Sequence, residues 1–165
     1  MITLWREPMG YEAFGAAAVL FGGFLLARGM NEAEDKKIAQ LEAIIAVMRF
    51  FRVQIDCYCV PIGEIFKRCD KSILLSCGCD AEFRDFYEFS HSLSPRPDRE
   101  IERLLESFAA ELGSSYREEQ LKSCDYHIEK LSQIFECERE EIMKRKKLNM
   151  TVCLCASAAA VIFLI

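Results

Sequence analysis

Nine cysteines give this chain of 165 residues its clearest potential for chemistry. Six of them form three Cys-x-Cys pairs, which are Cys57 with Cys59, Cys77 with Cys79, and Cys153 with Cys155. This spacing is one residue shorter than in a zinc knuckle, and residues i and i+2 of a helix point to different faces. Cys77 and Cys79 flank a turn glycine and could bind a metal together with Cys69, but small apolar packing residues are the simpler interpretation. We therefore predict no metal site and no cofactor.

A cysteine and a histidine, Cys124 and His127, lie three residues apart, a spacing that brings two side chains together on a helix. A thiol nucleophile with a histidine base needs that proximity and also a pocket. Cys124 falls on an apolar seam, however, which favours packing, and His91 follows a helix beside a proline-rich loop. The chain also lacks a glycine-rich phosphate loop, a metalloprotease helix motif and a serine elbow. The sequence thus predicts no catalytic residues and a protein that is not an enzyme.

The apolar residues, 52% of the chain, are concentrated at its two ends, and the charged residues, 28%, fill the middle. Residues 13–27 carry no charge, and residues 148–165 form a second uncharged run behind the cations of "KRKK". A helix that crosses a bilayer needs about 20 apolar residues, so both runs are of marginal length. We predict transmembrane helices over residues 10–29 and 148–165. For the first run, a cleaved signal peptide or a buried core helix is the alternative.

The cations beside these runs predict their orientation. Arg28, Lys36 and Lys37 follow the first run, whereas only Arg6 precedes it. The second run is preceded by five cations, which are Arg139, Lys144, Arg145, Lys146 and Lys147. Because positively charged flanks stay in the cytoplasm, we predict that residues 30–147 are cytoplasmic and that the tail is a cell-membrane anchor. A reducing cytoplasm would keep the cysteines of the middle segment as thiols.

Helical periodicity predicts an all-α fold for this middle segment. A first helix should cover residues 32–57, and Pro61 either ends it or begins the next helix. Asp80 is the expected N-cap of a third helix. Asp98 should cap a further helix, for which Gly113 is the expected stop.

The last helix should begin at a capping box made by Ser115 and Glu118. Its apolar seam has the spacing of a heptad repeat and consists of Leu121, Cys124, Ile128, Leu131 and Phe135. No glycine or proline interrupts the chain after the seam, so one helix should leave the bundle as a solvated stalk and enter the membrane. The predicted fold is an antiparallel helical bundle flanked by two transmembrane helices.

Small residues recur at four-residue spacing in both apolar runs. The pairs are Ala18 with Gly22, Gly23 with Ala27, and Ala156 with Ala160. This spacing lets helix backbones approach closely, although alanine-rich runs also produce it by chance.

Residues 80–141 contain 17 acidic and 8 basic residues, a net charge of −9. Such a surface is often simply solvated, but it could also attract a basic partner. The candidate partner-binding residues are carboxylates around the Gly113 turn, namely Glu100, Glu102, Glu106, Glu118 and Glu119. The whole chain has a net charge of −5, which argues against nucleic acid as a partner.

Two segments resemble the signatures of a single family. In "RFFRVQIDCYCVPIGEIFKRC" the matching residues are Ile55, Tyr58, Pro61, Ile62, Glu64 and Phe66. In "ELGSSYREEQLKSCDYHIEKLSQIFECEREEIMKRKKLNM" they are Leu112, Gly113, Ser114, Gln120, Leu131, Lys146 and Leu148. The family is stage III sporulation protein AB, and the resemblance extends from the first apolar run to the last. Its motif positions are represented here by Ile55, Pro61, Gly113 and Gln120.

The resemblance implies a membrane protein of endospore-forming bacteria whose soluble part is similar to type II secretion F platform domains. It implies a place in the secretion-like feeding channel between mother cell and forespore, in the mother-cell membrane around the forespore. The implied partners are the channel's cytoplasmic ATPase, stage III sporulation protein AA, and other channel proteins. Two alternatives remain open from the residues alone: a general pilus or secretion assembly scaffold, and a redox or metal sensor built on the cysteines.

Overall fold

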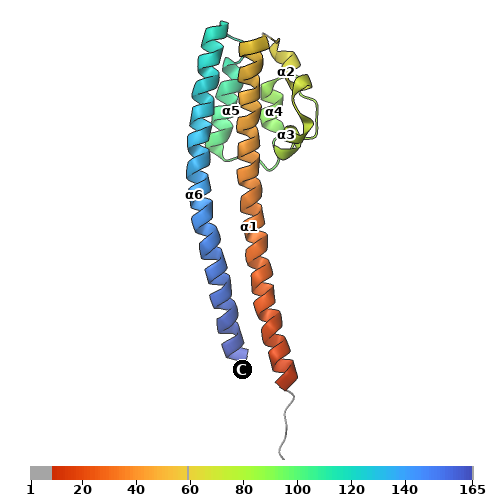
Figure 1. Ribbon diagram of the computed structural model, residues 1–165, viewed down its shortest axis with the longest axis vertical. Coiled ribbons are helices and arrows are strands. Elements are labelled where there is room, and N and C mark those ends of the chain that lie inside the picture. Colours follow the sequence, from red (N-terminus) through yellow and green to blue (C-terminus); the bar gives the residue numbers. More distant parts are fainter. Residues whose placement is uncertain (1–8, 59, 165) are drawn as a thin grey trace, which may run out of the picture. The chain divides into compact units, whose positions relative to one another are not determined.

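The computed structural model describes residues 9–58 and 60–164, and all regular structure within them is helical, as predicted. In chain order (Figure 1) the elements are α1 (Met9–Val53), the π-helix η1 (Gln54–Tyr58), α2 (Ile62–Arg68), α3 (Lys71–Ser76), α4 (Phe86–Ser92), α5 (Arg99–Glu111) and α6 (Arg117–Leu164). The chain divides into two compact units. We call Asp35–Arg139 the bundle unit, and the residues up to Glu34 together with those from Glu140 onward the terminal unit.

The two predicted transmembrane helices are not found. Throughout the described part of the chain, no helix is both long enough and apolar enough to cross a membrane. Some side chains of both predicted spans lie outside the description, namely those of residues 10–14 and 16 in the first span and 161 and 163–165 in the second.

Aromatic side chains join the helices of the bundle unit. Apolar residues recur along α1 every three or four positions, so they line its packed side, and Phe51 near the C-terminal end of this row is fully buried. The ring of Phe51 contacts Phe66 of α2 and Phe86 of α4 at centroid distances of 4.8 and 5.4 Å. Phe86 then contacts Phe108 of α5 at 4.7 Å. One edge-to-face cluster therefore holds four helices together.

Aspartates cap the short helices of the bundle unit. The Asp70 carboxylate accepts a hydrogen bond from the Ser72 amide at 2.8 Å, which lowers the pKa of Asp70 and begins α3. The Asp85 carboxylate accepts from the Glu88 amide at 2.8 Å and begins α4. Asp80, the expected cap of this helix, instead lies in irregular chain ahead of it. Only a residue directly before the first turn can reach the free amides of that turn, and that residue is Asp85.

The start of α6 differs slightly from the predicted capping box. The carbonyl of Tyr116 accepts the first helical bond, from the Gln120 amide at 3.0 Å, so Tyr116 rather than Ser115 is the N-cap. Within the terminal unit, Ile142 is 3% exposed, so the predicted solvated stalk is partly buried. The predicted apolar seam is confirmed: Cys124 and Leu131 are buried in the core, and Leu121, Ile128 and Phe135 are partly buried and pack against it.

Gln40 of α1 fastens two loops of the bundle unit to the helix. Its side chain is buried, and its Nε2 donates to the carbonyl oxygens of Cys77 at 2.9 Å and Pro95 at 2.8 Å. The first loop contains the predicted turn at Gly78, where φ is +81°. A Cβ atom on Gly78 would overlap the carbonyl oxygen of Ser94 in the second loop, so the two loops are in close contact.

Replacing Gln40 with leucine should lower the free energy of unfolding by about 2–3 kcal/mol, because two loop carbonyls lose their donor and stay buried. Urea unfolding of the detergent-solubilised chain, followed by circular dichroism, measures this loss. The control is Gln133→Leu at an exposed position of α6, which should change stability by less than about 0.5 kcal/mol. Equal unfolding midpoints for the two variants would contradict this role of Gln40.

In the terminal unit, the first part of α1 lies beside the last part of α6. Gly23 permits a close approach, since a Cβ there would overlap Oγ of Ser157. Ala27, one turn further on, is 1% exposed. The spaced pair Gly23 and Ala27 therefore lies at a helix contact, whereas Ala18 and Ala156 are exposed.

Candidate functional site

Two stretches that are distant in the sequence meet at one end of the bundle unit. The first contains η1 and the start of α2, the second is residues 112–119, and we call the surface they form the tip. The π-helical winding of η1 matters here, because such segments are rare and frequently occur at functional sites. Pro61 then begins α2 as its N-cap residue, as its position in the sequence suggested.

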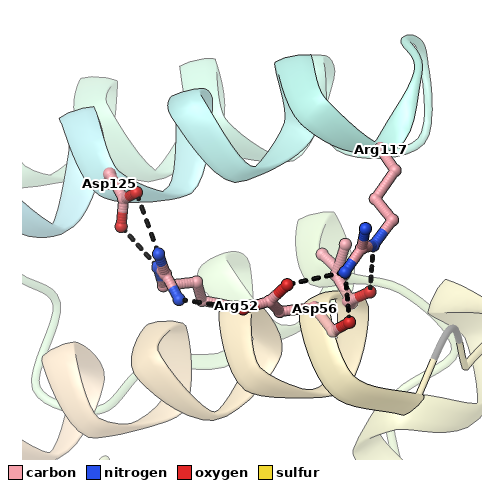
Figure 2. A network of polar contacts seen from close by, with 5 residues as sticks. Arg52, Asp56, Arg117 and Asp125 are labelled. Carbon is pink, nitrogen blue, oxygen red and sulfur yellow. Dashed lines mark hydrogen bonds and ion pairs between the residues drawn. The ribbon is translucent and has the colours of Figure 1, made fainter.

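Arg117 holds η1 to the start of α6. Its Nη2 donates to the Asp56 carbonyl and lies 2.6 Å from Asp56 Oδ1, and its Nε donates to the Ile55 carbonyl at 3.4 Å. Figure 2 shows the guanidinium facing the end of η1, where a helix leaves carbonyls without backbone partners. One cation thus satisfies two of these carbonyls and pairs with a carboxylate.

Arg52 forms a second connection between α1 and α6. Its guanidinium binds both oxygens of Asp125, with Nη2 to Oδ2 at 3.2 Å, and its Nη1 lies 3.6 Å from Asp56. Asp56 therefore lies between two arginines, as Figure 2 shows. The hydrogen bond with Asp125 raises the pKa of Arg52. A bidentate pair of this kind fixes orientation as well as distance.

A glycine turn completes the tip. Gly113 has φ of +84° just after α5, as predicted, and a Cβ on it would lie 2.9 Å from Cδ1 of Ile62. Gln120 closes the turn by donating from Nε2 to the Ser115 carbonyl at 2.8 Å. The motif positions of the two resembling segments therefore gather at the tip, although they come from separate parts of the chain: Ile55, Pro61, Gly113 and Gln120.

The sequence did not identify the arginines as site residues. Arg117 and Asp56 are 61 positions apart, and Arg52 and Asp125 are 73 apart, so no local spacing connects them. The single local signal was the i,i+4 spacing of Arg52 and Asp56, which is typical of an ordinary helix ion pair.

Exposed tyrosines and carboxylates cover the outside of the tip. Tyr116 is 87% exposed and Tyr58 is 64% exposed. Glu118 and Glu119 are exposed in the first turn of α6, where carboxylates favour the positive end of the helix dipole. Among the described residues, neither of these two carboxylates has an ion-pair partner.

The other three candidate carboxylates lie on α5. Glu100 and Glu102 are in its first turn, at the end of the helix opposite to the Gly113 turn. Glu102 pairs with Arg96 at 3.8 Å, and Glu106 pairs with His91 at 3.6 Å. Thirteen residues of helix span roughly 20 Å, so the five candidates form two separate groups instead of one cluster around the turn.

The cysteines of the bundle unit are mostly packing residues. Cys69, Cys77 and Cys79 are buried, and burial raises the pKa of each thiol, that of Cys77 to about 12. A raised pKa keeps a thiol protonated and therefore a poor metal ligand or nucleophile. Of the residues that the structure describes, no three His, Cys, Asp or Glu side chains are grouped to hold a metal ion. Cys57 is exposed, and Cys59, the other member of its Cys-x-Cys pair, lies outside the described residues.

Cys124 and His127 do not form a nucleophile and base. Burial raises the pKa of the Cys124 thiol to about 11. His127 is 1% exposed, its Nδ1 lies 2.9 Å from the Ser123 carbonyl, and its ring packs on Phe108 at 5.4 Å. The Nδ1 proton is therefore used in a hydrogen bond to the backbone, and both side chains belong to the core.

Alkaline pH should destabilise the bundle unit through these thiols. The pKa values of Cys77 and Cys124 are raised from 9.0 in the unfolded chain to about 12 and about 11 in the folded one. The folded state thus keeps protons that the unfolded state loses, so the contribution of these two thiols to the free energy of unfolding should be constant below pH 9.0 and fall as the pH rises toward 11 to 12. Urea midpoints across this range measure the effect.

Thiol alkylation checks which cysteines are buried and protonated in the folded chain. Near neutral pH, exposed Cys57 and Cys137 should react with iodoacetamide well before buried Cys77 and Cys124. Peptide mass spectrometry resolves the individual sites. Equal rates at the four sites would show that the buried thiols are ionised or accessible, against this account.

Described residues of the bundle unit line two open grooves of different size. The larger, about 820 Å³, is lined by apolar residues and by charged residues of both signs, including Phe66, Leu74, Phe83, Lys67, Lys71, Arg84, Asp80 and Glu82. The smaller, about 410 Å³, lies between α5 and α6 beside Glu100 and Lys130. The thiols that line the larger groove, Cys69 and Cys79, have raised pKa values, so neither offers a thiolate for chemistry.

A comparison with protein families finds a match over the C-terminal part of the chain. The family model of stage III sporulation protein AB matches residues 92–165, which contain α5, α6 and the second of the two resembling segments. No curated protein and no solved structure matches the chain. The resemblance inferred from the motif residues is thereby confirmed over residues 92–165, the part of the chain that is similar to the stage III sporulation protein AB family.

Proposed function

We propose that the protein is a non-enzymatic membrane platform of the sporulation channel between mother cell and forespore, and that it docks the cytoplasmic ATPase, stage III sporulation protein AA. The family match carries the sporulation role. The platform role goes beyond that match, and it is supported by a helical bundle that exposes Glu118 and Glu119, which have no ion-pair partner among the described residues, a surface suited to a basic protein.

The terminal unit supports attachment to the membrane around the forespore. Large apolar side chains are exposed on both of its helices, including Phe21, Leu25, Leu26, Leu148, Val152 and Ile162. Contiguous exposed apolar side chains of this extent mark surfaces that contact lipid or protein. Arg145 and the neighbouring lysines at 144, 146 and 147 would then lie at the cytoplasmic surface of the membrane.

Co-purification from sporulating cells tests the proposal. The full-length tagged chain is solubilised and isolated beside a variant in which the five candidate carboxylates are changed to lysine: Glu100, Glu102, Glu106, Glu118 and Glu119. Recovery of the ATPase with the native chain and its loss with the variant would support docking through acidic side chains. Recovery with both chains would support the proposed function and show that the ATPase contacts other residues. Absence of the ATPase from both preparations would contradict the proposal.

A further inference from the structure

We infer that the tip is the docking face for the ATPase, and that the ATPase surface seated on it is basic and contains an apolar recess for tyrosine. This inference rests on the proposed function and assigns it a location. The tip combines the exposed rings of Tyr58 and Tyr116 with the unpaired carboxylates of Glu118 and Glu119.

Charge distinguishes the tip from the rest of the acidic surface. On α5, Glu102 pairs with Arg96, Glu106 lies 3.6 Å from Nε2 of His91, and Glu100 borders the groove that Lys130 also lines. Glu102 is therefore partly neutralised within the chain, and Glu106 already has a polar partner there. Glu118 and Glu119 form no ion pair with any described residue, and Lys122, one turn further along α6, is not within ion-pair distance of either, so their field remains available to steer a basic partner.

The cations at the tip do not cancel this field. Arg117 is adjacent to both carboxylates in the sequence, but its guanidinium is turned toward Asp56 and the η1 carbonyls. Arg52 is likewise occupied by Asp125 and Asp56. The arginines thus connect α1 and η1 to α6 (Figure 2), whereas Glu118 and Glu119 are exposed.

The aromatic side chains supply contact area. Tyr58 ends η1 and Tyr116 precedes α6, and the Arg117 contacts with η1 place them on either side of one ion pair. Tyrosine is enriched among the residues that dominate binding energy, because it buries a large ring with few rotatable bonds. Their backbones are held by Arg117 and by the Gly113 turn, so little ordering is needed when a partner binds.

The test measures binding of the purified ATPase to the full-length chain in detergent. Two tip variants, Tyr58→Ser with Tyr116→Ser and Glu118→Lys with Glu119→Lys, should each weaken binding about tenfold or more. The matched controls carry the same changes elsewhere in the bundle unit. They are Tyr87→Ser with Tyr126→Ser, whose rings are 59% and 55% exposed, and Glu100→Lys with Glu106→Lys. Each control should stay within about twofold of the native chain, as for residues outside an interface.

Salt dependence adds a second readout. Binding of the native chain should weaken as sodium chloride is added, and the Glu118→Lys, Glu119→Lys variant should lose most of this dependence. Unchanged thermal midpoints show that the variants fold. If both tip variants bound like the native chain and the Glu100→Lys, Glu106→Lys control lost binding, the tip would not be the docking face. The proposed function would still stand. Failure of the native chain itself to bind would overturn the proposed function and this inference with it.

Discussion

Replacing Phe86 with alanine should lower the free energy of unfolding by about 3–5 kcal/mol, the usual cost of removing a buried ring. Phe86 is 1% exposed and contacts four other phenylalanine rings, Phe51, Phe66, Phe89 and Phe108. The substitution would leave a cavity among these rings. Since the rings come from α1, α2, α4 and α5, filling this cavity would require four helices to move. Urea unfolding of the detergent-solubilised chain measures the loss.

Tyr87→Ala is the control on the same helix. The Tyr87 ring is 59% exposed and stacks only on the exposed side chain of His91. Its removal should cost less than about 1 kcal/mol, as for most surface substitutions. If the two alanine variants unfolded at the same urea concentration, the aromatic cluster would not be the centre of the core.

Replacing Gly78 with alanine should destabilise the chain by more than about 1–2 kcal/mol, the cost of left-handed backbone for a residue with a Cβ. The backbone there has φ of +81°. The new Cβ would also overlap the backbone carbonyl of Ser94, so the two loops held by Gln40 would separate. Thermal unfolding by circular dichroism checks this expectation.

Gly63→Ala is the matched control for Gly78→Ala. Gly63 lies in α2, and a Cβ there would meet its nearest neighbour, the Arg84 carbonyl oxygen, at 3.7 Å, an ordinary contact. The substitution should raise the free energy of unfolding by up to about 1 kcal/mol, because alanine favours helix. Shifts of the same sign at both glycines would contradict the conformational argument.

The helical fold and the residues that enter the core could be predicted, because both follow from the spacing of apolar residues along the sequence. The seam from Leu121 to Phe135 repeats every three or four residues, so it had to line one side of a helix, and it packs in the core. The end of a helix at a glycine also depends on neighbouring residues alone, and Gly113 follows α5 as predicted. The N-cap residues were harder to predict. Asp80 and Asp85 are both plausible N-caps by type, and only the folded backbone selects Asp85.

The architecture of the tip could not be predicted from spacing. Arg117 meets Asp56 across 61 positions, and the contact exists only because α6 returns alongside α1. The motif residues Pro61 and Gly113 lie at the same end of the bundle unit as the arginines, but as turn residues they did not reveal them. A list of acidic residues also could not separate Glu118, which is unpaired within the described chain, from Glu106, which pairs with His91.

The central claim is that the protein anchors the ATPase at the membrane of sporulating cells, and membrane fractionation tests it most directly. The measured quantity is the fraction of stage III sporulation protein AA that sediments with membranes, in otherwise identical strains that contain or lack this chain. The account predicts that the ATPase sediments with membranes when the chain is present and becomes soluble when it is absent. Equal sedimentation in the two strains would contradict the account.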